Sequence, residues 1–141
     1  MKILITICAR GGSKGIPGKN IKVINEKPLI YYSLKTANAF KEKYKGEVDI
    51  VLSTDSPQIK EVVEKQGLYI DTDYTRPQEL ATDTAGKLGV IIDVKNFMEK
   101  KHQKAYDYVL DLDVTAPLRN VEDLENALSL LEQNKNAYNI F

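Results

Sequence analysis

The chain alternates short apolar runs with longer amphipathic segments, and this alternation limits the folds that its 141 residues can adopt. The apolar runs are rich in β-branched and aromatic residues, as buried strands are, and span residues 3–8, 48–52, 68–70, 106–112 and 137–141. The longer segments are predicted to be helices and span residues 28–44, 57–66, 85–101 and 121–134. Strand–helix alternation of this kind predicts βαβ units and a parallel sheet. We therefore expect a three-layer, Rossmann-like α/β fold, with helices on both faces of a mostly parallel sheet.

Residue types at the ends of the predicted helices support their boundaries. Ser56 precedes Pro57, which is an N-cap followed by a proline at the first helical position. Gly67 suits the left-handed position just past a helix C-terminus. Asn120 precedes an acidic first turn, which complements the helix dipole. These signals predict helix starts at residues 57 and 121 and a helix end before residue 67.

Composition excludes several classes of protein. Lys and Arg number 20 and Asp and Glu number 20, so the chain lacks the basic footprint of a domain that binds duplex nucleic acid. No apolar run approaches the ~20 residues that span a bilayer, and the apolar N-terminus is too short for a signal peptide. The single cysteine, Cys8, lies inside an apolar run and cannot form an internal disulfide. We expect a cytoplasmic protein that binds neither nucleic acid nor membranes.

The last apolar run, residues 137–141, coincides with the end of the sequence. A parallel sheet is covered by helices on both faces, so a final strand with no following helix leaves part of a face bare. We therefore expect residues 1–141 to be a single domain that is incomplete at its C-terminus. The alternative is a terminal strand docked at the edge of a complete sheet.

The segment after the first predicted strand, residues 9–20, carries the most informative chemistry. Ligands of open α/β sheets bind beyond the carboxyl ends of the strands, where this segment lies. Four glycines let its backbone approach a ligand and turn N–H groups toward an anion, and Arg10, Lys14 and Lys19 add positive charge. The segment predicts a site for a triphosphate or pyrophosphate. A solvated glycine-rich surface loop is the alternative.

Two common phosphate-binding motifs are absent from this segment. A Walker A motif requires Ser or Thr after Gly-Lys, whereas Gly18-Lys19 is followed by Asn20. The Rossmann G-x-G-x-x-G pattern also fails, because Ser13 stands where its second glycine is needed. Any phosphate site here is therefore of another kind.

Four blocks of sequence, each at the exit of a predicted strand, together resemble the acylneuraminate cytidylyltransferases, the CMP-sialic acid synthetase family. The blocks are Ala9 to Asn20, Ser53-Thr54-Asp55, Arg76 to Ala85 and Asp113 to Arg119. They occur in the family's order and cover the whole chain, which is more specific than any single block. The resemblance implies the nucleotide-diphospho-sugar transferase fold, of which residues 1–141 would be the N-terminal, nucleotide-binding portion.

The resemblance also implies a reaction. The family activates a nine-carbon keto acid sugar, sialic acid or a bacterial relative, with CTP to give a CMP-sugar and pyrophosphate. Alternatives are another nucleotidyltransferase, such as one acting on 3-deoxy-manno-octulosonate, and a noncatalytic nucleotide-binding module. Family members carry sugar contacts, a dimerisation arm and further aspartates beyond the region matched here. We therefore expect the full-length protein to be a homodimer and this chain alone to turn over little.

By resemblance, the first block would cradle the triphosphate and the third would contact the base. Lys19 and Arg10 are the predicted catalytic residues, because a mobile ammonium can follow the leaving pyrophosphate and a guanidinium fork matches phosphate oxygens. Asp83 would orient the loop or cap the helix over residues 85–101. Lys87 stands where the family often has a small hydroxyl residue. The predicted nucleotide-binding residues are Ala9, Arg10, Gly11, Gly12, Ser13, Lys14, Lys19, Asn20, Arg76, Thr84, Ala85, Asp113 and Thr115.

Asp111 and Asp113 are the predicted ligands of Mg²⁺. Alternation along a strand places both on one side of the sheet, and carboxylates that face phosphates suit this cation. We favour Asp113, which lies nearer the strand exit. The alternative is that Asp111 forms a structural ion pair with a neighbouring lysine or arginine. The Asp-Leu-Asp form of this block resembles family members that act on bacterial relatives of sialic acid such as legionaminic acid.

Overall fold

A parallel sheet of three strands forms the centre of the structure, a computed structural model that describes residues 1–12 and 15–140. The strands are β1 (Lys2–Cys8), β4 (Glu47–Ser53) and β5 (Tyr108–Asp111), in the order β4-β1-β5. β1 pairs in parallel with both neighbours, which explains why its sequence is a continuous apolar run rather than an alternating one.

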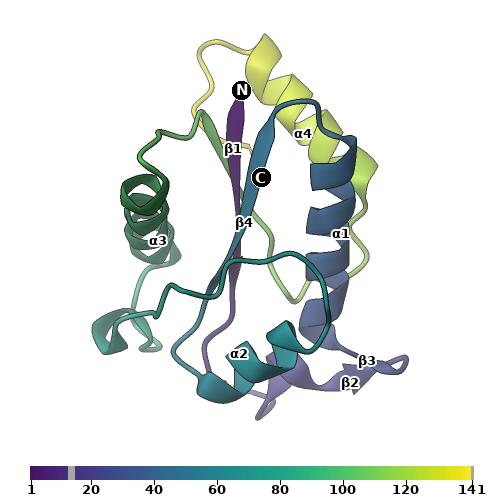
Figure 1. The fold of residues 1–141 in the computed structure, drawn as a ribbon, viewed down its shortest axis with the longest axis vertical. Helices are drawn as coiled ribbons and strands as arrows, with labels where there is room; N and C mark the ends of the chain where they lie inside the picture. The colour runs from purple at the N-terminus through teal and green to yellow at the C-terminus, as the bar shows by residue number, and fades with distance from the viewer. Residues whose placement is uncertain (13–14, 141) are drawn as a thin grey trace.

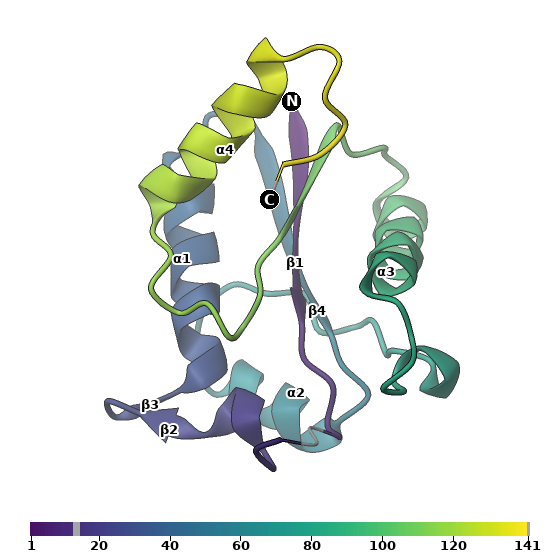
Figure 2. The same ribbon diagram turned by 180° about the vertical axis from the view of Figure 1, so that it is seen from behind.

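Helices cover both faces of this sheet (Figure 1, and from behind Figure 2). α1 (Leu29–Lys43) and α4 (Val121–Gln133) pack on one face, and α3 (Lys87–His102) packs on the other. Because side chains alternate along β1, Ile5 belongs to the core under α1 and α4, whereas Leu4 packs with the core under α3. The predicted three-layer fold is confirmed.

Smaller elements lie beyond the carboxyl ends of β1 and β4. α2 (Pro57–Glu64) and the 3₁₀ turn η1 (Lys19–Ile21) lie there, next to the antiparallel pair β2 (Val23–Ile24) and β3 (Lys27–Pro28) (Figure 1). A second 3₁₀ turn, η2 (Gln78–Leu80), precedes α3. Two of these elements, η1 and α2, border the predicted phosphate loop.

The predicted helix signals are confirmed. The Ser56 hydroxyl accepts a hydrogen bond from the Ile59 amide at 3.3 Å and caps α2. Gly67 has φ of +70°, a left-handed conformation that a residue with a Cβ adopts at a cost. Asn120 and Asp123 form a reciprocal capping box at the start of α4.

Two predicted strands are wrong. Residues 68–70 form no strand, because the Tyr69 amide donates to the Asn38 side chain, and only Asp71 makes a single parallel bridge, to Val51. Residues 137–140 form no strand either: the Ala137 amide closes a turn onto Asn134, and Phe141 lies outside the described residues. A short apolar run becomes a strand only where its own backbone groups pair with a neighbouring strand, and in these two runs the Tyr69 and Ala137 amides donate to other partners.

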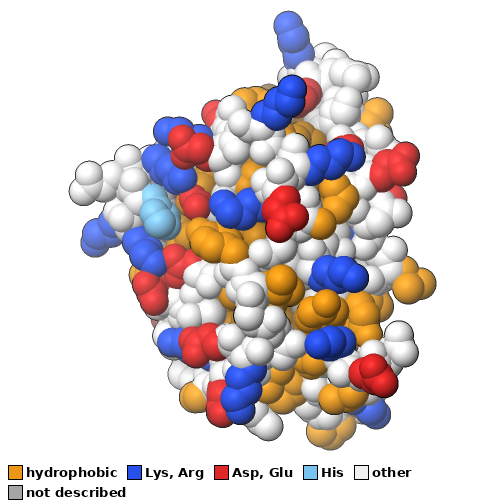
Figure 3. All heavy atoms as spheres, turned by 45° about the vertical axis from the view of Figure 1, so that its right-hand side comes forward, with side chains coloured by type: hydrophobic (Ala, Val, Ile, Leu, Met, Phe, Trp, Pro, Cys, Tyr) orange, Lys and Arg blue, Asp and Glu red, His pale blue; other side chains and the backbone are white. Residues whose placement is uncertain are grey.

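The surface mixes charges of both signs. On the face in Figure 3, Lys and Arg side chains lie next to Asp and Glu side chains, with apolar side chains between them. This pattern agrees with the formal net charge of zero. Among the described helices, none combines the length and apolar character that crossing a membrane requires.

Candidate functional site

The carboxyl ends of β1, β4 and β5 meet at one edge of the sheet, and the four blocks of the sequence gather there. Because all three strands are parallel, the segments that follow Cys8, Ser53 and Asp111 leave the sheet on the same side. The third block reaches this edge through the buried Arg76, whose amide donates to the Thr54 carbonyl at 3.0 Å.

The first loop is fastened at its start to the exit of β4, and its end is bonded back to its start. The amide of the buried Ala9 donates to the Ser53 carbonyl at 2.9 Å, and the Gly11 amide donates to Asp55 Oδ1 at 2.8 Å. The buried Asn20 side chain donates to the Arg10 carbonyl at 3.2 Å and so ties the end of the loop to its start. Ala9 and Asn20, both predicted nucleotide contacts, are therefore held in the scaffold. Gly12 is exposed, and Ser13 and Lys14 lie outside the described residues.

The two predicted catalytic cations line the same small cavity. Arg10 and Lys19 border a space of about 30 Å³ together with Ser56 and Gln58 at the start of α2. That volume is about the share of one water molecule in the liquid, so the described loop encloses no room for a nucleotide. A triphosphate would have to lie across the open side of the loop, within reach of both cations.

Arg10 forms an ion pair with Asp83, which joins the first block to the third. The prediction that Asp83 caps the following helix is wrong, since the N-cap of α3 is Gly86 and no side chain caps it. Each partner of the pair keeps about a third of its side chain exposed, 31% for Arg10 and 34% for Asp83. Exposed pairs of this kind contribute little stability, so an anionic ligand can compete for the guanidinium.

The third block contributes one buried and two accessible residues. Arg76 is 6% exposed, and its guanidinium donates to the hydroxyl and the carbonyl of Ser53 at 3.1 and 2.9 Å. Those bonds hold the exit of β4 in place. Thr84 is exposed and Ala85 half-buried in the turn before α3, where the Ala85 amide donates to the Thr82 carbonyl at 3.3 Å.

Asp111 and Asp113 both face the ammonium group of Lys87. Lys87 Nζ lies 2.7 Å from Asp111 Oδ2 and 3.6 Å from Asp113 Oδ2. Asp111 Oδ1 accepts from the Thr6 hydroxyl at 2.8 Å, and Asp113 Oδ1 accepts from the Thr115 hydroxyl at 2.7 Å. The structure thus places Asp111 in the ion pair that the sequence had left open as the alternative to metal binding.

This arrangement shifts the pKa of three of its groups. Burial alone would lower the pKa of Lys87, but its hydrogen bond to Asp111 and the two negative charges raise it. Burial likewise opposes ionisation of Asp113, but hydrogen bonds from the Thr115 amide and hydroxyl lower its pKa overall. Burial, with the charge of Asp111, raises the pKa of Cys8 to about 12, which agrees with a core thiol rather than a nucleophile.

The carboxylates do not fit a preformed metal site. Among residues 1–12 and 15–140, no cluster of three or more His, Cys, Asp or Glu side chains could hold a metal ion. Asp111 and Asp113 each use one oxygen within the scaffold and turn the other toward Lys87. A divalent cation prefers six or more oxygen ligands, so this pair would need further ligands and a displaced lysine.

Sequence reasoning missed two residues of this edge. The sequence places Thr6 inside the predicted strand over residues 3–8, and it marks Lys87 only as a departure from the small hydroxyl residue that the family often has there. The register that sets Thr6 opposite Asp111 depends on which strands pair, which the sequence does not state. The signal that could have marked Lys87 is a basic residue at the first position of a helix, where the dipole disfavours positive charge.

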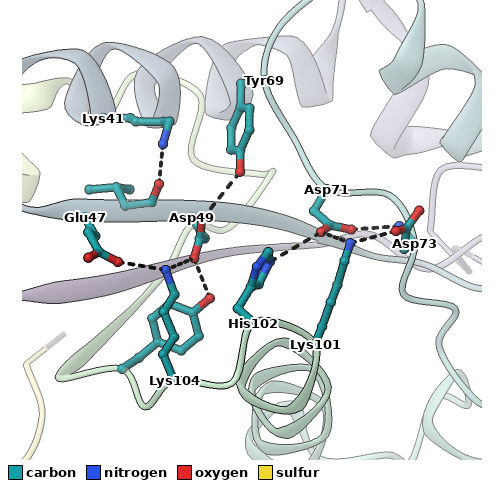
Figure 4. Close-up of polar contacts among 11 residues, drawn as sticks. Lys41, Glu47, Asp49, Tyr69, Asp71, Asp73, Lys101, His102 and Lys104 are labelled. Atoms are coloured by element: carbon teal, nitrogen blue, oxygen red, sulfur yellow. Dashed lines mark hydrogen bonds and ion pairs between the residues drawn. The ribbon is translucent and has the colours of Figure 1, made fainter.

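A second polar cluster lies at the opposite end of the sheet, where β4 begins (Figure 4). Asp49 accepts from Lys104 at 2.7 Å and from the Tyr106 hydroxyl at 2.6 Å, and Lys104 also contacts Glu47 at 3.0 Å. These hydrogen bonds outweigh burial and lower the pKa of Asp49. An open cleft of about 410 Å³ lies beside this cluster, larger than the cavity at the first loop. The charged groups of the cluster, Glu47, Asp49 and Lys104, are paired with one another, so we assign the cluster a structural role.

Comparison with known proteins gives consistent matches over almost the whole chain. The model of a family described as cytidylyltransferase matches residues 4–140. Post-translational flagellin modification protein B of Campylobacter coli is 40% identical over 138 residues, which cover 96% of this chain and 55% of that protein. CMP-N,N'-diacetyllegionaminic acid synthase of Campylobacter jejuni is 40% identical over 116 residues, or 82% of this chain and 47% of that protein. The chain thus spans about half the length of these curated relatives.

The fold also matches a solved structure. A CMP:2-keto-3-deoxy-manno-octonic acid synthetase complexed with CTP superposes with a TM-score of 0.71 over 96% of this chain and 49% of that one. The sequence identity is 23%, so this likeness supports the architecture alone.

Proposed function

Because the chain belongs to the cytidylyltransferase family, we propose that it is the nucleotide-binding part of an enzyme that transfers the cytidylyl group of CTP to a nine-carbon keto acid sugar. The anomeric oxygen of the sugar bonds to the α-phosphorus of CTP, and the bond from that phosphorus to the bridging oxygen of pyrophosphate breaks. The hydroxyl proton passes to solvent, and the products are a CMP-sugar and pyrophosphate. A relative named for CMP-N,N'-diacetyllegionaminic acid supports a bacterial relative of sialic acid as the sugar.

The observation that carries this proposal is the convergence of Arg10 and Lys19 on one cavity at the carboxyl edge of the sheet. Such a reaction needs little covalent chemistry from the protein, because its barrier falls when the reactants are held in line and phosphate charge is neutralised. Arg10 would exchange its contact with Asp83 for phosphate oxygens. Lys19 would follow the charge that develops on the leaving pyrophosphate.

The remaining residues predicted to contact the nucleotide differ in how exposed they are. Gly12 would present its backbone N–H group to the phosphates, whereas the Gly11 amide already donates to Asp55 and would hold the loop in shape. Thr84 and Ala85 would border the base, and Thr115 would reach the nucleotide from the exit of β5. Arg76 would act on the nucleotide only through the strand exit it holds, because its guanidinium is buried against Ser53.

A divalent cation such as Mg²⁺ would accompany the triphosphate. The charge on a triphosphate favours a bound divalent cation, which would neutralise phosphate charge. Asp111 and Asp113 already share the ammonium of Lys87, so they would hold such a cation only after the lysine had moved away. A homodimer of the full-length protein stays a prediction, as does a cytoplasmic location, which the absence of a second cysteine favours.

Calorimetric titration with CTP, compared with UTP and ATP, tests the proposal. We expect CTP to bind at least about tenfold more tightly than UTP, because a mismatched hydrogen-bonding edge is costly when buried. The variant Lys19→Gln should weaken CTP binding by about tenfold or more. Lys22→Gln is the matched control, because Lys22 is exposed and does not line the cavity. Equal affinity for the three nucleotides would reduce the loop to a general anion site.

A further inference from the structure

We propose that Lys87 is the resident cation of the Asp111–Asp113 pair and keeps divalent ions out of it while no nucleotide is bound. This inference concerns the same edge of the sheet as the proposed function and rests on it, since a triphosphate would bind there. The contact of Lys87 with the two carboxylates, however, is present in the chain without any ligand.

The two carboxylates are built to share one cation. Each directs Oδ1 to a fixed partner, Thr6 for Asp111 and Thr115 for Asp113. Each turns Oδ2 toward Lys87, at 2.7 Å for Asp111 and 3.6 Å for Asp113. The ammonium therefore lies where a divalent cation shared by these two oxygens would lie.

The position of Lys87 is costly for the helix that carries it. Lys87 is the first residue of α3, whose N-cap is Gly86 without a side-chain cap and whose first turn holds no acidic residue. A positive charge at a helix N-terminus opposes the dipole, so local helix energetics favour other residue types there. Local rules are typically broken where a tertiary contact or a function compensates, and here the compensating contacts are Asp111 and Asp113.

Lys87 reduces the negative charge at the carboxyl edge of the sheet. Two ionised carboxylates alone would carry a charge of −2 and would repel an incoming triphosphate, whereas with Lys87 the group carries −1. The Lys87 side chain is 47% exposed, so its flexible stem can turn the ammonium from the carboxylates to a phosphate. Lys87 is thus a positioning residue that sets the charge of the site before the substrate arrives.

Titration of the free chain with Mn²⁺, followed by electron paramagnetic resonance and without any nucleotide, tests the inference. We expect no binding to wild type or to Lys87→Arg at about 1 mM Mn²⁺, the range of weak oxygen sites. Lys87→Met, which keeps an unbranched side chain one atom shorter and removes the charge, should bind Mn²⁺ about tenfold or more tightly than wild type. Adding Asp111→Asn to Lys87→Met should abolish the gain.

Two results would overturn the inference. One is equal Mn²⁺ binding by wild type and Lys87→Met, and the other is a gain in binding that survives Asp111→Asn. If Lys87→Met fails to fold, Lys87→Ser takes its place, because a small hydroxyl side chain is tolerated at an exposed helix start. The Mn²⁺ titration contains no CTP, so its outcome does not depend on whether the chain binds nucleotides. The CTP titration likewise does not depend on the outcome of the Mn²⁺ titration.

Discussion

The close approach of Gly11 to the start of α2 gives the sharpest prediction about the first loop. A Cβ added at Gly11 would lie 3.0 Å from Ser56 Cβ, tighter than nine in ten real contacts of a Cβ atom. Ser56 is the N-cap of α2, and the Gly11 amide donates to Asp55, so both contacts would be disturbed together. Gly11→Ala should therefore loosen the loop and the helix start at once.

The expected loss of stability in Gly11→Ala is the sum of three contributions. Loss of an N-cap costs about 1 kcal/mol, and loss of a hydrogen bond to a charged group costs about 1 kcal/mol more, whereas alanine recovers about 0.5 kcal/mol from the unfolded state. The net destabilisation is about 1–2 kcal/mol. With an unfolding entropy of about 2.1 cal/mol/K per residue, a chain of 141 residues should lose about 3–7 °C in Tm.

Thermal unfolding followed by circular dichroism measures this loss, and the neighbouring residue provides the control. A Cβ added at Gly12 would meet nothing within 4 Å, so Gly12→Ala should leave Tm unchanged or raise it slightly. Removing the Ser56 Cβ with Ser56→Gly, a substitution that costs a cap only a few tenths of a kcal/mol, should rescue Gly11→Ala. Strict additivity of Gly11→Ala and Ser56→Gly, or equal Tm values for the two alanine variants, would refute the steric reasoning.

Three further predictions concern the scaffold. Asp49→Asn should lower the free energy of unfolding by about 1–3 kcal/mol at pH 7, because Lys104 and Tyr106 lose an ionised partner. Since the folded-state pKa of Asp49 is lowered, this stabilisation is present above the unfolded-state pKa near 4 and is lost as pH falls through the folded value, so wild type and variant should converge in urea titrations at low pH. Gly89→Ala, inside α3 with open space around the new Cβ, should raise the free energy of unfolding by about 0.5–1 kcal/mol in the same assay. With its pKa raised to about 12, Cys8 should react with iodoacetamide at pH 8 about 1,000-fold more slowly in the folded chain than when unfolded.

Each of these predictions has a result that contradicts it. Glu125→Gln, which removes an exposed pair with Lys43, is the control for Asp49→Asn and should change the free energy of unfolding by less than about 0.5 kcal/mol. Wild-type stability that rises relative to Asp49→Asn as pH falls from 7 toward the unfolded-state pKa near 4 would contradict the sign of the pKa shift. Destabilisation by Gly89→Ala, or equal alkylation of Cys8 in folded and unfolded chains, would contradict the other two.

The class of fold and the place of the site follow from the sequence alone, because both depend on local information. Apolar runs of strand length, helices with Ser56 and Asn120 at their N-caps, and parallel connections lead to one architecture. In that architecture the segments after the strands must meet at one edge. The glycine-rich loop and its cations could therefore be assigned to that edge from the sequence.

The tertiary structure decided which of these side chains pair with one another. Whether a short apolar run becomes a strand depends on which partners its backbone groups meet in the folded chain, and within residues 68–70 the Tyr69 amide donates to the Asn38 side chain. Arg10 pairs with Asp83, and Lys87 with Asp111, across many residues of sequence. Such pairs follow from strand register and helix placement, which are properties of the whole packed chain, so the residue types alone cannot tell a carboxylate that awaits a metal from one that already holds an ammonium.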